Sequence, residues 1–380
     1  MIMGFTKKDN RRNKFMLHGG LAQKGYDWWW HSFTGISRKD NSERQFFVEY
    51  FLINPALGGD KPVFGQLPGN KENGIRPSYL MVKAGAWGKD AHQLHRFFPW
   101  SEVSVSSDDE LLLSAGDCLL RDDRIEGSVN VSDEQAKDHP EYMCDGGSMS
   151  WELSIEKVVP YNVGYGTSEL FRELEAFEMY WHASGIKSRY SGTVQYNGEY
   201  YDVIPERSFG YADKNWGSNF TSPWVWLSSC RIFSIKQNRY LEDTVFDIGG
   251  GCPRVFGVPL QRKLLSAMYY EGREMEFNFS KFWTFTTTAF NCHETDEEII
   301  WHVRQGNLWY EMITDIRCRK EDMLLVNYEA PDGTKRHNKL FNGGNGKGRI
   351  LLYKKDFFGN KLIDVLNVSS VGCEYGEFDT

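Results

Sequence analysis

Hydrophobic and polar positions alternate over many short stretches of this chain, and turn-forming pairs lie between them. Residues 191–206, SGTVQYNGEYYDVIPE, place an Asn-Gly pair at 197–198 between two arms rich in Tyr and Val, which predicts a tight hairpin. The pairs Glu-Gly at 271–272 and Gly-Asn at 359–360 predict two more hairpins. Strands joined by such short turns must run antiparallel. We therefore expect a mainly antiparallel β protein.

Helical periodicity is rare in the sequence. The best candidate is 167–178, TSELFRELEAFE, where apolar residues recur at helical spacing behind a Thr or Ser that can cap the helix. Residues 54–78 and 121–147 combine Gly, Pro and polar residues without a period, which predicts long loops. Long loops in compact proteins often form the lid or rim of a binding site.

The composition supports the β interpretation and excludes several classes of protein. Aromatic residues make up 15% of the chain, and 37 glycines accompany them, a combination that favours pleated sheets joined by tight turns. Hydrophobic residues at 41% and charged residues at 25% are typical of a soluble globular protein rather than a disordered chain. The formal net charge of −8 argues against a nucleic-acid partner, because such binding depends on cationic groups.

The cysteines and the N-terminus indicate a cytoplasmic protein. The seven cysteines are odd in number and include no C-x-x-C pair, so neither a disulfide framework nor a zinc ribbon is expected. The first 15 residues are cationic, but no apolar signal segment follows them, and no run is long enough for a transmembrane helix. The sequence does not indicate an oligomeric state.

Two segments about half a chain length apart share a pattern. Residues 27–33, DWWWHSF, and 213–220, DKNWGSNF, both fit D-x-x-W-x-S with a nearby Phe, and each precedes an apolar strand. The match suggests two related β units of similar size, with coincidence in a Trp-rich chain as the alternative. Since 380 residues can form two domains, we expect an N-terminal unit over 1–190 and a C-terminal unit over 191–380.

Residues 192–230, GTVQYNGEYYDVIPERSFGYADKNWGSNFTSPWVWLSSC, resemble the signature region of the tocopherol cyclase-like family. The segments YDWWWHSF, SYLMVKAGAWG, MSWELS and DIGGGCPRVFG resemble other parts of that family, in the same order. The similarity runs from about residue 15 to the end of the chain, and it is most specific over 211–226.

The resemblance implies two lipocalin-like antiparallel β-barrel or sandwich units with few helices, holding a hydrophobic ligand in a barrel mouth or between the units. Plant members of the family cyclise a prenylated quinol to a chromanol, without a cofactor, by protonating an alkene. The 54–78 loop and the His-rich 92–95 segment have no counterpart in the family pattern. The expected ligand class is therefore broad, namely a prenyl-phenol or a terpenoid-like compound.

Alkene protonation at neutral pH requires an acid that keeps its proton, such as a carboxyl group buried among apolar groups. Asp213 is the first candidate, because Trp216, Trp224 and Trp226 are close to it in sequence and could stabilise a cation by cation–π attraction. Asn215 belongs to the same segment and is a candidate ligand contact. The alternatives are that Asp213 caps a turn, which would lower its pKa, and that the tryptophans only pack a core.

A second group of candidates lies near the N-terminus. If 27–33 is extended, Asp27, Trp29 and His31 share one face, and a histidine beside a carboxylate can act as an acid or an orienting donor. We therefore add Asp27 and His31 as catalytic candidates, with Trp29, Trp30 and His182 as ligand contacts. The alternative for Asp27, Trp29 and His31 is an exposed polar face. The alternative for His182 is an ordinary buried histidine.

No metal or cofactor is expected. His92 and His95 lack a third ligand at a standard spacing. The glycine runs at 249–251 and 342–348 lack the context of a dinucleotide or phosphate loop.

The favoured function is a cofactor-independent cyclase or isomerase that acts on an unsaturated hydrophobic small molecule by general-acid catalysis. A non-catalytic carrier of lipids or terpenoids is the main alternative. A carbohydrate-active β enzyme is the third possibility, and it would need two carboxylates about 5–10 Å apart in an open groove.

Overall fold

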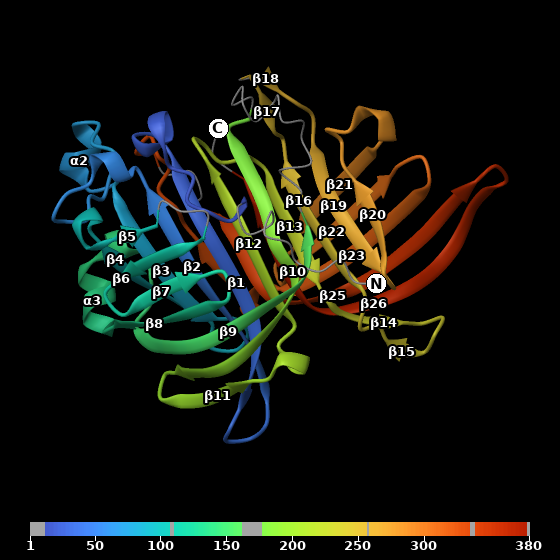
Figure 1. Cartoon of the computed structure of the whole chain (residues 1–380), viewed down its shortest axis with the longest axis horizontal. Helices are drawn as coiled ribbons and strands as arrows, with labels where there is room; N and C mark the ends of the chain where they lie inside the picture. The colour runs from blue at the N-terminus through green and yellow to red at the C-terminus, as the bar shows by residue number, and fades with distance from the viewer. Residues whose placement is uncertain (1–11, 107–109, 162–176, 257, 335–338, 378–380) are drawn as a thin grey trace.

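The computed structural model describes residues 12–106, 110–161, 177–256, 258–334 and 339–377. Most of these residues belong to two large antiparallel sheets that lie side by side (Figure 1). The first sheet contains β1 (Tyr26–Ser37), β2 (Glu43–Ile53), β3 (Tyr79–Ala86), β4 (His92–Phe98), β5 (Ser104–Val105), β6 (Leu112–Ala115), β7 (Cys118–Arg121), β8 (Arg124–Val131), β9 (Gly147–Tyr161), β10 (Met179–Tyr196), β11 (Glu199–Val203) and β12 (Gly210–Gly217).

The second sheet contains β13 (Trp224–Ser229), β14 (Arg231–Ser234), β15 (Arg239–Tyr240), β16 (Val245–Gly251), β19 (Lys263–Tyr270), β20 (Arg273–Phe277), β21 (Thr287–Glu294), β22 (Glu298–Gly306), β23 (Tyr310–Arg319), β24 (Met323–Val326), β25 (Leu340–Asp356) and β26 (Gly359–Gly376). A separate ribbon pairs β17 (Arg254–Val255) with β18 (Val258–Pro259). The described α-helices are short: α2 (Pro68–Glu72) and α3 (Asp133–Asp138). Single 3₁₀ turns occur at Gly19–Ala22, Pro55–Leu57, Trp100–Glu102, Pro140–Tyr142, Pro205–Arg207, Phe282–Thr284 and Lys320–Asp322. The mainly-β prediction is confirmed.

The three predicted hairpins are present. Asn197 and Gly198 join β10 to β11 with φ values of 46° and 83°, as a turn with two left-handed positions requires. The pair at 271–272 joins β19 to β20. The hairpin of β25 and β26 is also present, but its turn lies at 357–358 rather than at the predicted Gly-Asn pair, because Gly359 pairs with Asp356 and Asn360 pairs with Lys355. Local turn chemistry was therefore sufficient to place the first two turns, whereas the third lies two residues before the predicted pair.

Of two further local predictions, one is wrong in part and the other falls largely outside the described residues. The loop predicted over 121–147 is wrong in part, because β8 and α3 lie within it. Ser132 and Gln135 form a capping box that starts α3, and Ile125, Val129 and Val131 of β8 are buried. The helix predicted over 167–178 lies outside the described residues, apart from its last two positions.

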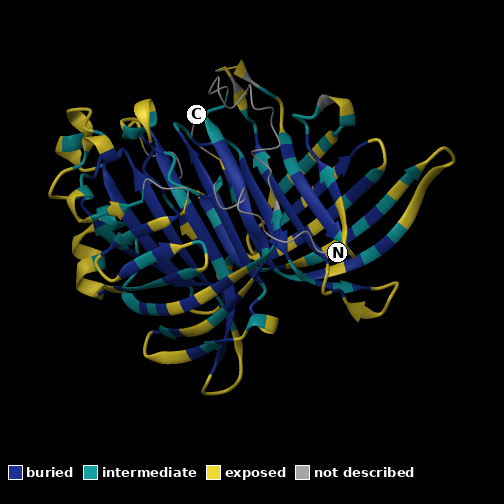
Figure 2. Cartoon of the chain, viewed as in Figure 1, coloured by how far each residue is buried: buried dark blue, intermediate teal, exposed yellow. Residues whose placement is uncertain are grey.

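Alternation along the strands divides the buried apolar residues into three clusters. One fills the interior of the first unit and includes Trp29 and Phe33, and another fills the second unit and includes Val225 and Leu227. The third cluster lies between the two sheets and draws on both, for example Trp30 and Trp226. The central strands are therefore buried along much of their length (Figure 2).

The chain passes from the first sheet to the second between Gly217 and Trp224. The predicted boundary at 190/191 falls inside β10, because β12 returns to the first sheet and pairs with both β1 and β10. The division into two separately folding units stays a prediction.

The two similar segments at 27–33 and 213–220 are not equivalent positions of two units. They pair with each other in β1 and β12, with Trp30 opposite Asp213, so the duplication interpretation is wrong for these segments. Within the described parts of the chain, no helix is long and apolar enough to cross a membrane.

Candidate functional site between the two sheets

A cleft lies where the two sheets face each other. It encloses about 490 Å³ of space between atoms, counting its opening to solvent. Its lining combines aromatic rings with three carboxyl groups, and the described lining contains no cationic side chain: Trp28, Trp30, Glu49, Met179, Asp213, Phe220, Thr221, Trp224, Trp226, Tyr328, Leu340 and Glu374. About 30 Å³ of this space is open to a water-sized molecule, so a small-molecule guest requires the side chains of the lining to move apart. The aromatic lining suits an apolar guest.

One wall of the cleft is a row of three side chains on neighbouring strands. Glu49 of β2 and Asp213 of β12 are both direct cross-strand partners of Trp30 in β1. Cross-strand partners project from the same face of a sheet, and adjacent strands lie roughly 4.8 Å apart. The two acids therefore flank the Trp30 indole, with backbones about 10 Å apart.

The second sheet provides the facing wall. Trp226 of β13 pairs with Glu374 of β26, and Trp224 lies two residues away on the same face of its strand. Trp224 Nε1 donates a hydrogen bond to Glu374 Oε2 at 2.5 Å, and Asn342 Nδ2 donates to Oε1 of the same carboxyl. This wall is thus held in place by its own polar contacts.

The surroundings of Asp213 favour a protonated carboxyl group. Burial raises its pKa from 3.8 to about 8, against the lowering effect of two hydrogen bonds. Both of these bonds reach Oδ2, from Trp181 Nε1 at 2.7 Å and from the Tyr211 hydroxyl at 3.1 Å. Oδ1 is buried and has no hydrogen-bond partner among the described residues. The proton of Asp213 is therefore assigned to Oδ1. After this proton leaves, the two donors at Oδ2 stabilise the negative charge of the carboxylate.

Two further acids near the cleft are also shifted. Burial raises the pKa of Glu374 to about 7. Asp247, which accepts a hydrogen bond from Trp226 Nε1 at 3.1 Å, does not line the cleft. Burial, together with repulsion from Asp213 when that group is ionised, raises the pKa of Asp247 well above its usual range. The low polarity of the region thus keeps carboxyl protons bound near neutral pH.

Glu49 differs from these acids because it has a cationic partner. Its Oε2 lies 2.9 Å from Lys83 Nζ, and both side chains are fully buried. The Tyr328 hydroxyl also donates to Oε2 at 2.9 Å, and the Lys83 ammonium lies 3.8 Å from the centre of the Tyr328 ring. Oε1 has no hydrogen-bond partner among the described residues. One oxygen of Glu49 is therefore free to accept a proton or a hydrogen bond.

The structure separates the predicted site residues onto two faces of the first sheet. Trp30 and Asp213 line the cleft, as do Trp224 and Trp226 of the second sheet. Asn215 lies on the same face as Asp213 and accepts a hydrogen bond from the Tyr26 hydroxyl at 3.0 Å.

The remaining predicted residues face the interior of the first unit. Asp27, Trp29 and His31 do share one face, as predicted, but alternation directs that face away from the cleft. Asp27 forms a buried ion pair with Lys214, and burial raises the pKa of Asp27 to about 6. His31 Nδ1 contacts the Tyr190 hydroxyl at 2.8 Å, and burial lowers the pKa of His31 to about 3. His31 is thus neutral at pH 7 and is not available there as a proton donor.

His182 and Trp216 also lie on the inner face. His182 pairs in register with Lys214, which places both on the same side of the sheet. Trp216 stacks on Tyr180, with ring centres 5.4 Å apart. These positions are in the packed interior of the first unit rather than on the cleft wall.

Sequence reasoning missed several residues of the site. Glu49 and Glu374 line the cleft, Trp28 adds a ring, and Trp181 holds Asp213. A detectable signal was present for Glu49, because an acid in the middle of the apolar run FFVEYFLI is hard to place on an exposed face. Among the described residues, no cluster of His, Cys, Asp and Glu is arranged to hold a metal ion.

The fold and the cleft define a two-sheet β protein with an enclosed aromatic and acidic site. A family model for tocopherol cyclase-like proteins matches residues 123–340, more than half of the chain, and the chain belongs to this family. The resemblance deduced from the sequence is therefore confirmed. No curated protein matches the chain.

Two solved structures are similar in outline. The crystal structure of an AttH-like protein from Nitrosomonas europaea is 11% identical, with 91% of this chain and 92% of that chain covered and a TM-score of 0.39. The crystal structure of CghA with Sch210972 is 10% identical, with 94% of this chain and 90% of that chain covered and a TM-score of 0.46.

Proposed function

We propose that this protein is a cofactor-independent cyclase or isomerase that protonates an alkene of a hydrophobic small molecule held between the two sheets. The supporting observation is Asp213, a carboxyl group on the cleft wall whose pKa is raised to about 8 and whose Oδ1 has no partner among the described residues. The ligand class is a prenyl-phenol or terpenoid-like compound. The cytoplasm, where the cysteines stay reduced, is the proposed compartment.

The first step transfers a proton from Asp213 to the alkene. The O–H bond at Oδ1 breaks and a C–H bond forms with the π electrons, which leaves a tertiary cation on the neighbouring carbon. The two donors at Oδ2, Trp181 and Tyr211, stabilise the carboxylate that remains. This arrangement favours the transition state more than the resting acid, because the charge develops where donors already point.

Aromatic rings stabilise the cation. Trp30 lies between the two acids on one wall, and Trp224 and Trp226 lie on the other. A desolvated cation–π contact contributes about 2 kcal/mol, which is roughly 30-fold in rate, so several rings and the acid must act together.

The second step closes the ring. The phenol oxygen forms a C–O bond to the cation, its O–H bond breaks, and Glu49 Oε1 accepts the proton. Glu49 suits this role because Lys83 and Tyr328 occupy its other oxygen. The product is an isomer of the substrate. Return of the proton from Glu49 to Asp213 through solvent completes the cycle, so no redox partner is required.

The test compares two isosteric substitutions. Asp213→Asn removes the acid on the cleft wall, and the matched control Asp247→Asn changes a carboxyl group that also contacts Tyr211 but does not line the cleft. Both variants and the wild type are assayed with a prenylated hydroquinone, with turnover followed by chromatography and binding by tryptophan fluorescence. We expect Asp213→Asn to bind the compound and to lose at least ~100-fold in kcat, a typical contribution of a general acid. The kcat of Asp247→Asn should stay within about threefold of the wild-type value. Asp247 is uncharged when it keeps its proton, and the asparagine that replaces it is uncharged as well.

Two results would count against the proposal. Equal turnover by wild type and Asp213→Asn would remove Asp213 as the acid. Tight binding without turnover by the wild type, for prenyl-phenols and for polyenes, would favour the non-catalytic carrier.

A further inference from the structure

The hairpin formed by β25 and β26 ends in an unusually exposed apolar tip. Phe357 and Phe358 are 98% and 97% exposed, respectively, and the tip projects from the second sheet on the right of Figures 1 and 2. The two rings contact each other, with centres 5.9 Å apart, and are otherwise open to solvent. Large apolar side chains exposed at a projecting turn indicate an interaction site.

Other exposed apolar residues lie along the same edge of the second sheet. The turn between β22 and β23 contributes Leu308 and Trp309, and it contacts the hairpin directly, because Lys355 N donates a hydrogen bond to Trp309 O at 2.7 Å. Leu308 N in turn donates to Thr284 O at 3.2 Å, and the neighbours of Thr284, Trp283 and Phe285, are exposed as well. We name Trp283, Phe285, Leu308, Trp309, Phe357 and Phe358 the apolar edge.

The charge around the tip is opposite to that of the whole protein. Residues 354–361, KKDFFGNK, contain three lysines and one aspartate, whereas the whole chain has a formal net charge of −8. Asp356 accepts a hydrogen bond from the backbone N of Phe358 at 2.8 Å and so shapes the turn. The segment that carries the two aromatic side chains thus has a formal charge of +2, from three lysines and one aspartate.

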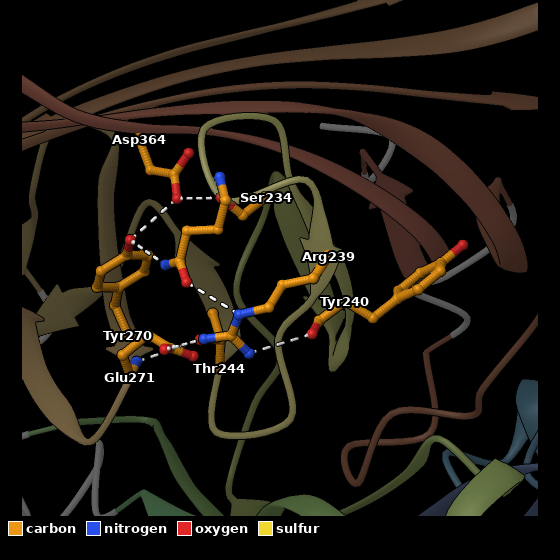
Figure 3. A network of polar contacts seen from close by, with 8 residues as sticks. Ser234, Arg239, Tyr240, Thr244, Tyr270, Glu271 and Asp364 are labelled. Carbon is orange, nitrogen blue, oxygen red and sulfur yellow. Dashed lines mark hydrogen bonds and ion pairs between the residues drawn. The ribbon is translucent and has the colours of Figure 1, made fainter.

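A polar network supports the base of the hairpin (Figure 3). Asp364 of β26 accepts hydrogen bonds from Ser234 Oγ at 2.5 Å and from the Tyr270 hydroxyl at 2.9 Å. Nearby, Arg239 forms an ion pair with Glu271 at 2.6 Å. These contacts join β26 to strands β14 and β19, so the tip is presented by a braced hairpin.

We propose that the tip and the apolar edge dock on the surface of an anionic lipid bilayer. Exposed Trp and Phe enter the interfacial layer of the bilayer, and lysines beside them attract anionic headgroups. The convex shape favours a fluid partner, because lipid can surround both phenylalanine rings whereas a flat protein surface would cover them on one side only. The proposal does not depend on the proposed function, since binding to lipid requires no turnover.

The test measures co-sedimentation of the full chain with vesicles of phosphatidylcholine, with and without phosphatidylserine. We expect the wild type to bind the phosphatidylserine vesicles and to bind less as salt is raised. Phe357→Ala/Phe358→Ala should weaken binding by about tenfold or more for each ring removed. Lys354→Gln/Lys355→Gln/Lys361→Gln should weaken it by roughly fivefold per lysine and should abolish the preference for phosphatidylserine.

The matched control is Tyr200→Ala, which removes a half-exposed aromatic residue from β11 of the first sheet and should bind like the wild type. Phe357, Phe358, Lys354 and Lys361 are exposed and Lys355 is half-buried, so the variants should melt close to the wild-type temperature. Failure of the wild type to bind either vesicle would overturn the proposal, as would equal binding by the Phe357→Ala/Phe358→Ala variant. Concentration-dependent dimers that this variant abolishes, without vesicle binding, would assign the edge to a second copy of the chain and also overturn it.

Discussion

Asp213→Asn should make the protein more stable at neutral pH. Between pH 3.8 and about 8, the folded protein holds a proton on Asp213 that the unfolded chain releases. The folded state then binds more protons than the unfolded state, so the free energy of unfolding falls as pH rises through this range. Asparagine carries no titrating proton and avoids this loss.

The size of the effect follows from the pKa difference. Neutral pH lies about 3 pH units above 3.8, and each unit corresponds to 1.36 kcal/mol, so ionisation of Asp213 in the unfolded chain costs the folded state about 4 kcal/mol at pH 7. The hydrogen bonds should survive, because the Asn Oδ1 can accept from Trp181 and Tyr211 as the Asp Oδ2 does. The amide nitrogen would replace the carboxyl oxygen that has no partner in the described structure.

The assay is urea denaturation of both proteins from pH 4 to pH 8. We expect Asp213→Asn to exceed the wild type by about 4 kcal/mol at pH 7 and by less than about 1 kcal/mol at pH 4. Asp123→Asn, which alters a well-exposed carboxylate, is the control and should change stability by no more than about 0.5 kcal/mol. A variant no more stable than the wild type at pH 7 would mean that Asp213 is ionised in the folded protein, and it would refute the reasoning.

Three further predictions follow from the same structure. The kcat/KM of the wild type should fall as pH rises through about 8, because Asp213 then loses its proton, and a pH-independent profile from pH 6 to pH 10 would contradict this assignment. Gly249→Ala should lower the free energy of unfolding in urea by about 1–3 kcal/mol and should reduce kcat. A Cβ at this position would lie 2.6 Å from the ring of Trp181, which donates a hydrogen bond to Asp213. Unchanged values would show that the ring can move freely. Lys214→Met should lower the free energy of unfolding by about 3–5 kcal/mol, because Asp27 then stays buried without its partner. The double variant Asp27→Leu/Lys214→Met should recover most of this loss. A double variant as unstable as the single one would rule out the loss of the ion pair as the cause.

The parts of the fold that depend on local chemistry could be predicted from the sequence. The turn at 197–198 requires two left-handed residues, and Asn-Gly provides them, so the hairpin was clear. The pairing of β1 with β12 could not be predicted, because it joins segments half a chain apart, and their similar sequences suggested duplication instead. Strand pairing over such a distance leaves no local pattern.

The candidate site was also predicted only in part, because local sequence patterns identify single residues but not the face of the sheet on which the site lies. Asp213 could be identified because its carboxyl group is close in sequence to three tryptophans, whose apolar rings favour a protonated acid. The face that lines the cleft could not be deduced, because β1 is apolar on both faces, with Tyr26 and Trp30 on one side and Trp29 and Phe33 on the other. Alternation therefore grouped Asp27 with His31 correctly but did not indicate which core they face.

Glu49 is another residue whose role depends on a contact that the sequence does not show. Its strand is apolar on both sides, so alternation alone suggested a fully buried strand and gave the acid no partner. Lys83, which neutralises it, comes from the next strand of the sheet and is directly opposite in register. Only the three-dimensional pairing identifies these two residues as a unit.

The central claim is that an acid in the cleft donates a proton to carbon. The most direct test is turnover of a prenylated hydroquinone in D2O, with the product analysed by mass spectrometry. We predict one deuterium bound to the carbon beside the newly formed C–O bond, and no such product from the Asp213→Asn variant. A cyclised product without deuterium on carbon, or the same labelled product at the same rate from the variant, would contradict the claim.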